Sequence, residues 1–152
     1  MRLAEAMKCS WTDQPVQVHL ETQPYPPMVF MAEGHKSRED DAIPLPPDLA
    51  VWLRKTPLEE RVGLVAPVTL ETVSRMSELI SEIGEAAAII VNDDGKHASA
   101  HDFRRSFGTR WAAKVRPVTL QRIMRHSSIE TTLRYYVGLS SADAGADLWA
   151  SA

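Results

Sequence analysis

Polar and apolar positions alternate with a period of two near the start of the chain. Val16, Val18 and Leu20 are separated by polar residues, which is the spacing of a half-buried strand. Residues 28–31 read as a second strand, and residues 42–45 as a third that ends at a proline. Prolines and a charged loop separate the three segments. The pattern predicts a small three-stranded antiparallel sheet.

Helical patterns surround and follow these strands. Residues 3–9 are helix formers, and a second helix opens at Pro47 and closes at Thr56-Pro57. A clearer helix starts at Thr69, with its apolar residues on one side and Gly84 at its end. The apolar run that follows, residues 86–91, fits either a helix or a strand.

The last third of the chain contains the strongest helix signals. Ser99 and Asp102 have the spacing of an N-cap residue and its capping-box partner. The helix after them places Phe103, Phe107 and Trp111 four residues apart, which predicts a buried aromatic stripe. Two shorter helices follow, one with proline in its first turn and one capped by a serine.

Bulk composition indicates an ordinary globular chain of about one domain. Of its 152 residues, 44% are hydrophobic and 24% are charged. The single cysteine, Cys9, excludes an internal disulfide and fits a reducing compartment. Neither a signal peptide nor an apolar run long enough to cross a membrane is visible. We therefore expect one cytoplasmic domain over residues 1–152, with no membrane attachment.

Charge is distributed unevenly, although the net charge is only −3. Residues 101–136 hold eight arginines and lysines against two acidic residues, a net of +6, which leaves −9 for the rest. The eight cations are Arg104, Arg105, Arg110, Lys114, Arg116, Arg122, Arg125 and Arg134. A charge run of this kind is most often a solvated helix face. Interleaved histidines and tyrosines weaken that interpretation and favour a nucleic-acid partner.

Four residues of this basic region suit chemistry on a phosphodiester. His101 and Arg104 are three apart on a predicted helix and therefore share one face. A guanidinium binds phosphate oxygens through two parallel bonds, and histidine can donate or shuttle a proton near neutral pH. His126 lies in a turn that can fold the helix of Tyr135 back toward it. A phenol has a pKa of about 10, so as a nucleophile it needs a base or a positive field.

The sequence His101-x-x-Arg104, then His126, then Tyr135 nine residues later resembles the catalytic domain of the tyrosine recombinase (phage integrase) family. The segments HDFRRSFGTR and RHSSIETTLRYY are similar to that family's two C-terminal motif boxes. The resemblance implies that Tyr135 attacks DNA and forms a 3′-phosphotyrosyl link. It also implies that Arg104 binds a non-bridging oxygen and that both histidines donate hydrogen bonds to the phosphate. No metal and no cofactor are implied, because side-chain cations neutralise the phosphate.

Two further residues extend the resemblance outside the basic region. The segment MRLAEAM resembles the family's first box, with its arginine at Arg2 and the accompanying glutamate at Glu5. Lys36, eight residues before Pro44, has the spacing of the family's hairpin lysine. The resemblance implies that Arg2 binds the phosphate and that Lys36 protonates the departing 5′ oxygen. Considered alone, without the resemblance, Lys36 is best explained as a solvated loop lysine.

Other cations of the basic region are expected to contact the DNA backbone or to lie on the plain surface. The candidates for DNA contact are Arg105, Arg110, Arg122 and Arg125. Arg125 stands where the family usually has glycine, and this either changes the local backbone or adds a phosphate contact.

Two alternatives concern the identity of single residues. Tyr136 is the competing nucleophile, although the nine-residue spacing favours Tyr135. His97 and His101 are four apart and could bind a metal, but no third ligand is near them in sequence.

The sequence therefore predicts an α+β fold, a mainly helical catalytic domain with a small three-stranded antiparallel sheet near the N-terminus. The helices that normally precede the first box, and a core-binding domain, are expected to be absent. The resemblance implies double-stranded DNA as the partner and self-association as a tetramer on DNA. Two rivals stay open, a truncated DNA-binding fragment with weak catalysis and a protein-interaction domain whose basic helices meet an acidic partner.

Overall fold

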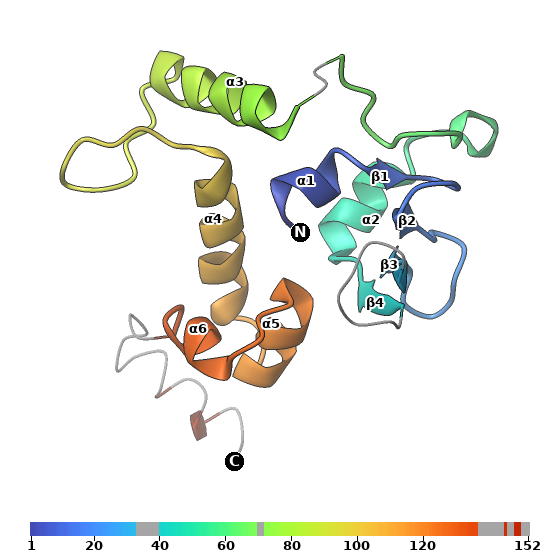
Figure 1. Ribbon diagram of the computed structural model, residues 1–152. Coiled ribbons are helices and arrows are strands. Elements are labelled where there is room, and N and C mark those ends of the chain that lie inside the picture. The colour runs from blue at the N-terminus through green and yellow to red at the C-terminus, as the bar shows by residue number, and fades with distance from the viewer. Residues whose placement is uncertain (33–39, 70–71, 137–144, 146–147, 150–152) are drawn as a thin grey trace. The chain divides into compact units, whose positions relative to one another are not determined.

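The computed structural model describes residues 1–32, 40–69, 72–136, 145 and 148–149. The chain divides into two compact units, Met1–Leu79 (unit 1) and Ile80–Ala152 (unit 2). Helices and strands are both present, as Figure 1 shows, so the predicted α+β class is confirmed. No helix of the described residues is both long enough and apolar enough to cross a membrane.

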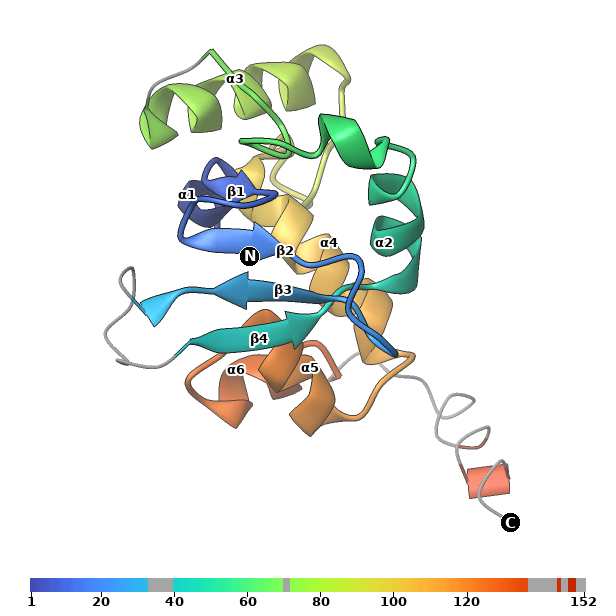
Figure 2. The same cartoon turned by 90° about the vertical axis from the view of Figure 1, so that its right-hand side faces the viewer.

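Unit 1 is built on a four-stranded sheet with the strands in sequence order. The strands are β1 (Cys9–Ser10), β2 (Val16–Val18), β3 (Pro27–Phe30) and β4 (Asp41–Pro44). The pairs β2–β3 and β3–β4 are antiparallel, and Figure 2 shows them side by side. These three strands are the ones predicted from the alternating pattern.

The predicted three-stranded antiparallel sheet is nevertheless wrong in one detail. β1 adds a fourth strand, and because it pairs parallel with β2 the sheet is mixed. β1 lies partly in the segment expected to be helical, whose helix α1 (Leu3–Ala6) is shorter than predicted. A strand of two residues is too short to display a period of two, so only its pairing with β2 reveals it.

The register of the sheet explains its burial pattern. Val16 lies opposite Phe30, and Met28 lies opposite both Val18 and Ile43. All five side chains are buried, and Phe30 is only 1% exposed. Because alternate residues of a strand point to the same face, the paired apolar positions form one continuous surface.

Two helical segments follow the sheet in unit 1. Helix α2 (Pro47–Leu53) begins at the predicted proline and buries Ala50 and Leu53, while Val51 and Trp52 are exposed. A short 3-10 turn, η2 (Leu58–Glu60), comes after it. Only a narrow side of α2 is therefore buried.

Helix α3 (Val73–Ala86) crosses the boundary between the units and does not end where the sequence predicted. Gly84, expected at its end, is a buried residue inside the helix. The backbone carbonyl of Ala98 lies where a Cβ of residue 84 would be, so the glycine permits this close approach. The helix ends two residues beyond Gly84, and Ala88 adopts a left-handed conformation with φ 51°.

Three successive helices follow in the part of unit 2 that the structure describes up to residue 136. They are α4 (Ala100–Ala112), α5 (Pro117–Met124) and α6 (Ile129–Leu133). Ala112, Leu120 and Met124 form their buried core, and Phe107 and Trp111 pack against it. Phe103, predicted to extend this aromatic stripe into the core, is 69% exposed, so that part of the prediction is wrong. Each residue turns about 100° around the helix axis, so side chains spaced four apart drift around the helix. Phe103 and Trp111, the two ends of the predicted stripe, therefore point in different directions.

Candidate active site

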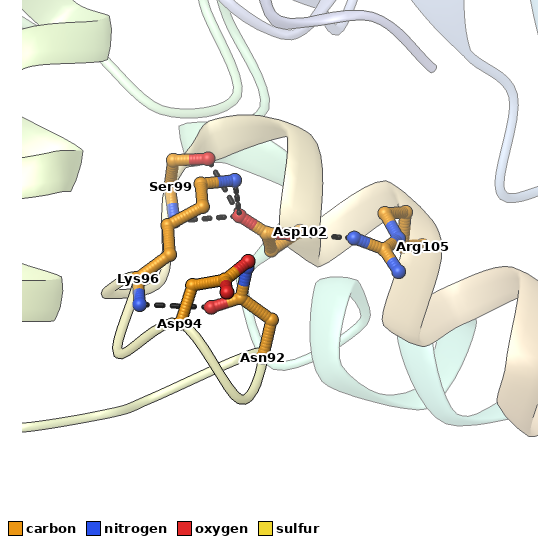
Figure 3. Close-up of polar contacts among 6 residues, drawn as sticks. All are labelled: Asn92, Asp94, Lys96, Ser99, Asp102 and Arg105. Carbon is orange, nitrogen blue, oxygen red and sulfur yellow. Dashed lines mark hydrogen bonds and ion pairs between the residues drawn. The ribbon is translucent and has the colours of Figure 1, made fainter.

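The N-terminus of α4 is fixed by the capping box that the sequence predicted. The backbone N–H of Ser99 donates to Asp102 Oδ2 over 3.0 Å, and the Ser99 hydroxyl donates to the same oxygen over 2.6 Å. Lys96 Nζ adds an ion pair to this oxygen at 3.2 Å, as Figure 3 shows. The hydroxyl bond, with support from Lys96, lowers the pKa of the buried Asp102 carboxyl to about 2. Asp102 is therefore ionised throughout the neutral range, and it holds the start of the helix that carries His101 and Arg104.

Arg104 links α4 to the end of α5. Its guanidinium Nη2 donates to the main-chain carbonyl of Met124, the last residue of α5. Carbonyls at a helix C-terminus lack partners within the helix and carry its negative dipole end, which favours a cation there. Arg104 is half-buried. Its bond holds the guanidinium at Met124, the residue that comes one before Arg125 and two before His126 in the chain.

The turn that carries His126 is a Schellman motif. Arg125 has left-handed backbone angles, φ 53° and ψ 49°. The N–H of Arg125 donates to the Arg122 carbonyl and the N–H of His126 donates to the Gln121 carbonyl, both over 3.1 Å. The Gln121 side-chain amide also donates to the carbonyl of His126 over 3.2 Å. Both sides of the His126 backbone are therefore held by bonds to α5.

The imidazole of His126 contacts two residues of the segment that follows. Its Nδ1 lies 2.9 Å from Thr132 Oγ1, a hydrogen bond, and Thr132 is fully buried. Its ring lies nearly parallel to the ring of Tyr135, with 10° between the planes and 6.1 Å between the centroids. Ser128 caps α6 by accepting from the N–H of Glu130, which fixes the start of the helix that carries Thr132.

Tyr135 itself lies just beyond α6, in the turn after Leu133, although the sequence predicted that the helix continues through it. Its ring packs on α4 at Gly108, where an added Cβ would lie 2.5 Å from Tyr135 Cε1. Only glycine leaves room for the ring at this depth. Gly108 therefore sets the position of the phenol from one side, and the His126 ring contacts it as well.

Tyr136, the competing nucleophile, has a different environment. Its hydroxyl donates to the carbonyl of Val115 over 2.7 Å, and burial raises the pKa of its phenol. A phenol with a raised pKa and an occupied hydroxyl is a poor nucleophile. The contacts of Tyr136 are therefore those of a packing residue on the core of unit 2.

The expected DNA-contact cations differ in how they are held. Arg105 is exposed and pairs with Asp102 at 3.5 Å. Arg110 lies over the ring of Trp111 with Cζ 5.8 Å from the centroid, and Lys114 lies over the same ring at 5.6 Å. A cation over an aromatic ring is attracted to its negative face, so both charges are gathered around one indole. Arg122 is exposed on α5.

Three further residues were predicted for the site: Arg2, Lys36 and His101. Arg2 lies in unit 1, where its backbone N–H donates to the Glu5 carboxylate over 2.6 Å at the start of α1. Lys36 lies outside the described residues. His101 is exposed on the first turn of α4. Within the described residues no group of three or more His, Cys, Asp or Glu side chains is placed to hold a metal ion.

Two residues of the arrangement were not identified from the sequence. Gly108 carried a usable signal, because glycine weakens a helix interior and its presence there points to a close approach. Thr132 carried none, because a threonine in a short helix has many ordinary explanations. The hydrogen bond between Thr132 and His126 forms only in the folded turn, so the sequence does not show it.

Comparisons with known proteins give a likeness of fold. No protein-family model matches the sequence, and no curated protein matches it. The structure is similar to that of the Tn1549 transposon integrase in complex with transposon right-end DNA, with a TM-score of 0.62 and 18% identity over 97% of this chain. It is also similar to the same integrase with circular-intermediate DNA, with a TM-score of 0.57 and 18% identity over 100% of this chain. The chain spans about half of those integrase chains, 54% and 56%. At this identity the likeness establishes an integrase-like fold.

Proposed function

We propose that the chain is the catalytic domain of a tyrosine recombinase that cleaves and rejoins double-stranded DNA. The observation that carries the proposal is the packing of the Tyr135 phenol against the His126 imidazole. Arg104 is held at the carbonyl of Met124, immediately before the turn that carries His126. The integrase-like fold, seen in structures that contain transposon DNA, gives independent support.

In the proposed reaction Tyr135 Oη attacks the scissile phosphorus and forms a 3′-phosphotyrosyl bond as the bond from phosphorus to the 5′ oxygen breaks. The phenol proton passes to a histidine, a role that falls to His101 by resemblance, because His126 donates to a phosphate oxygen. The departing 5′ oxygen takes a proton from Lys36, a role that rests on the resemblance alone. A base beside the phenol lowers the cost of ionising a group whose ordinary pKa is about 10.

Arginine cations stabilise the charge that develops on the phosphate. Arg104 supplies a guanidinium whose position is fixed by the α5 carbonyl, so little reorganisation is needed during attack. Arg2 and His101 complete the proposed set by resemblance. Because Arg104 is an arginine, it can bind two phosphate oxygens through two parallel N–H bonds, which a lysine cannot do.

Rejoining follows from the nature of the intermediate. The phosphotyrosyl ester retains the free energy of the broken phosphodiester, so a 5′ hydroxyl attacks it without a nucleotide cofactor. The same residues then act in reverse. We further propose that four protomers act together on paired DNA sites, with Arg105, Arg110, Arg122 and Arg125 contacting the backbone.

Trapping of the covalent intermediate tests the proposal. The purified chain is mixed with a pool of nicked duplexes whose sequence is randomised around the nick, so that the short 5′ fragment diffuses away after cleavage. Protein-linked DNA is then recovered after denaturation in SDS, amplified and sequenced. We expect a covalent adduct with the wild type and with Tyr136→Phe, and none with Tyr135→Phe.

Other outcomes separate the rival functions. Salt-sensitive retention of duplex DNA without an adduct contradicts catalysis and indicates a DNA-binding fragment. Loss of both retention and adduct contradicts double-stranded DNA as the partner. It favours the rival function, in which the basic helices bind an acidic protein. An adduct that persists in Tyr135→Phe but disappears in Tyr136→Phe would transfer the nucleophile to the neighbouring residue.

A further inference from the structure

We propose that Thr132 is a positioning residue for His126, whose hydroxyl fixes the orientation and the neutral tautomer of the imidazole. The Nδ1–Oγ1 distance is 2.9 Å, and Thr132 is 0% exposed. A buried hydroxyl needs a hydrogen-bond partner, and this bond joins it directly to the candidate catalytic ring. The inference rests on the role proposed for His126.

The hydrogen bond and the ring contact constrain the imidazole together. The Tyr135 ring lies nearly parallel to the imidazole, with 6.1 Å between the ring centroids, while Thr132 holds one edge at Nδ1. The N–H of Tyr135 also donates to the carbonyl of Thr132 over 3.0 Å. The residue that holds the histidine is therefore one turn from the proposed nucleophile and bonded to its backbone.

The direction of the hydrogen bond decides which nitrogen serves the substrate. In a neutral imidazole one nitrogen carries the proton and the other accepts. With the Thr132 hydroxyl donating to Nδ1, the proton stays on Nε2. Nε2–H is then the group that donates to a phosphate oxygen. Without the hydroxyl, the ring loses the interaction that prefers this tautomer.

Two substitutions at Thr132 separate positioning from packing. Thr132→Val keeps the branched shape and removes the hydroxyl, whereas Thr132→Ser keeps the hydroxyl and removes a methyl group. Hydrogen-bond partners that orient histidines at metal sites change activity by about 10- to 100-fold when lost, and we take the same order for this ring. We expect a loss of that size in covalent adduct for Thr132→Val and a nearly unchanged yield for Thr132→Ser. Thr131→Val is the matched control, because Thr131 is the exposed neighbour.

A spectroscopic measurement makes the test independent of cleavage. Nitrogen-15 correlation spectra of the histidine side chains are recorded on the DNA-free wild type and on each variant. We expect His126 to occupy the Nε2–H tautomer in the wild type and in Thr132→Ser, and a mixture of tautomers in Thr132→Val. Circular dichroism confirms that each variant is folded, and adduct yields are corrected for the folded fraction.

The results distinguish failure of this inference from failure of the proposed function. An Nδ1–H tautomer in the wild type, or an unchanged tautomer in Thr132→Val, overturns the positioning role whether or not DNA is cleaved. A larger loss of adduct in Thr132→Ser than in Thr132→Val assigns the residue to packing and also overturns it. Absence of adduct in the wild type contradicts recombinase activity, while the spectra still decide the role of Thr132.

Discussion

The two units of this protein are stabilised in different ways. Among the described residues, unit 1 buries eleven apolar side chains, from Cys9 to Leu53, most of them on or next to the paired strands. Unit 2 buries three, which are Ala112, Leu120 and Met124. Unit 1 therefore has the larger share of the hydrophobic driving force, which scales with buried apolar area.

Unit 2 also has polar contacts that hold specific groups of its helices and turns. Asp102 caps α4, Arg104 bonds the last carbonyl of α5, and Thr132 bonds the ring of His126. Contacts of this type define direction as well as distance, whereas apolar burial is non-directional. The difference suggests that residues needed at fixed angles are held by hydrogen bonds in unit 2, while unit 1 supplies a packed sheet.

The largest effect is expected from the core of unit 1. Phe30→Ala removes a ring that is 1% exposed, and we expect the free energy of unfolding to fall by about 3–5 kcal/mol. Tyr25→Ala is the aromatic control, because Tyr25 is 75% exposed, and it should change stability by less than about 0.5 kcal/mol. Urea titration measures both. A loss below about 1 kcal/mol for Phe30→Ala would contradict the view that this sheet is the packed scaffold.

The next effect concerns the contact between Gly108 and Tyr135. Gly108→Ala places a methyl group in the space of the phenol ring, so the ring must move. A misplacement of about 1 Å can cost a reaction about 100-fold, and we expect covalent adduct formation to fall by that order. Thr109→Ala, at the exposed neighbouring position of α4, should leave the adduct unchanged. Equal adduct from Gly108→Ala and the wild type would show that the phenol needs no such support.

A smaller effect is expected at the cap of α4. Asp102 has a pKa of about 2 in the folded chain against an ordinary value of 3.8. Its contribution to stability is therefore complete above about pH 4 and is lost as the pH falls toward 2. Asp102→Asn should lower the free energy of unfolding by about 1 kcal/mol at neutral pH and flatten its decline below pH 4. Asp93→Asn, in the exposed turn, serves as the control in urea titrations at each pH. A decline below pH 4 that is as steep in Asp102→Asn as in the wild type would contradict this account.

The smallest effect, and one of opposite sign, is expected at two left-handed residues of unit 2. Ala88 and Arg125 both end helices in Schellman motifs, with φ of 51° and 53°. Glycine adopts this conformation at lower cost, so Ala88→Gly and Arg125→Gly should each stabilise the fold by about 0.5–1 kcal/mol.

The same pair tests the DNA role of Arg125. If its side chain contacts a phosphate, only Arg125→Gly should weaken retention of duplex DNA and reduce the salt dependence of binding, with a change in slope of about 1. Retention that is weakened equally by Ala88→Gly would assign the effect to the backbone.

Local signals predicted much of the fold. The alternation of Val16 and Val18 placed a strand, the Ser99–Asp102 spacing placed a helix start, and Pro117 marked the first turn of α5. Each of these depends on residues close in sequence. β1 was not predicted, because its two residues become a strand only through pairing with β2.

The sequence proposed residues for the candidate site but not their geometry. Motif spacing identified His126 and Tyr135, and folding brings their rings together. It could not identify the supports of those rings, because Thr132 and Gly108 act through contacts across a turn and between helices. The left-handed conformation of Arg125 was also hidden, since an arginine gives no sign that a glycine-like backbone is required.

The most direct test of the account is to locate the attached DNA within the protein. Covalent complexes recovered from the nicked duplexes are digested with trypsin and nuclease, and the nucleotide-bearing peptide is fragmented in a mass spectrometer. We expect a nucleotide joined through its 3′ phosphate to Tyr135 and an unmodified Tyr136 in the same peptide. A nucleotide on any other residue, or no modified peptide from folded protein that retains DNA, would contradict it.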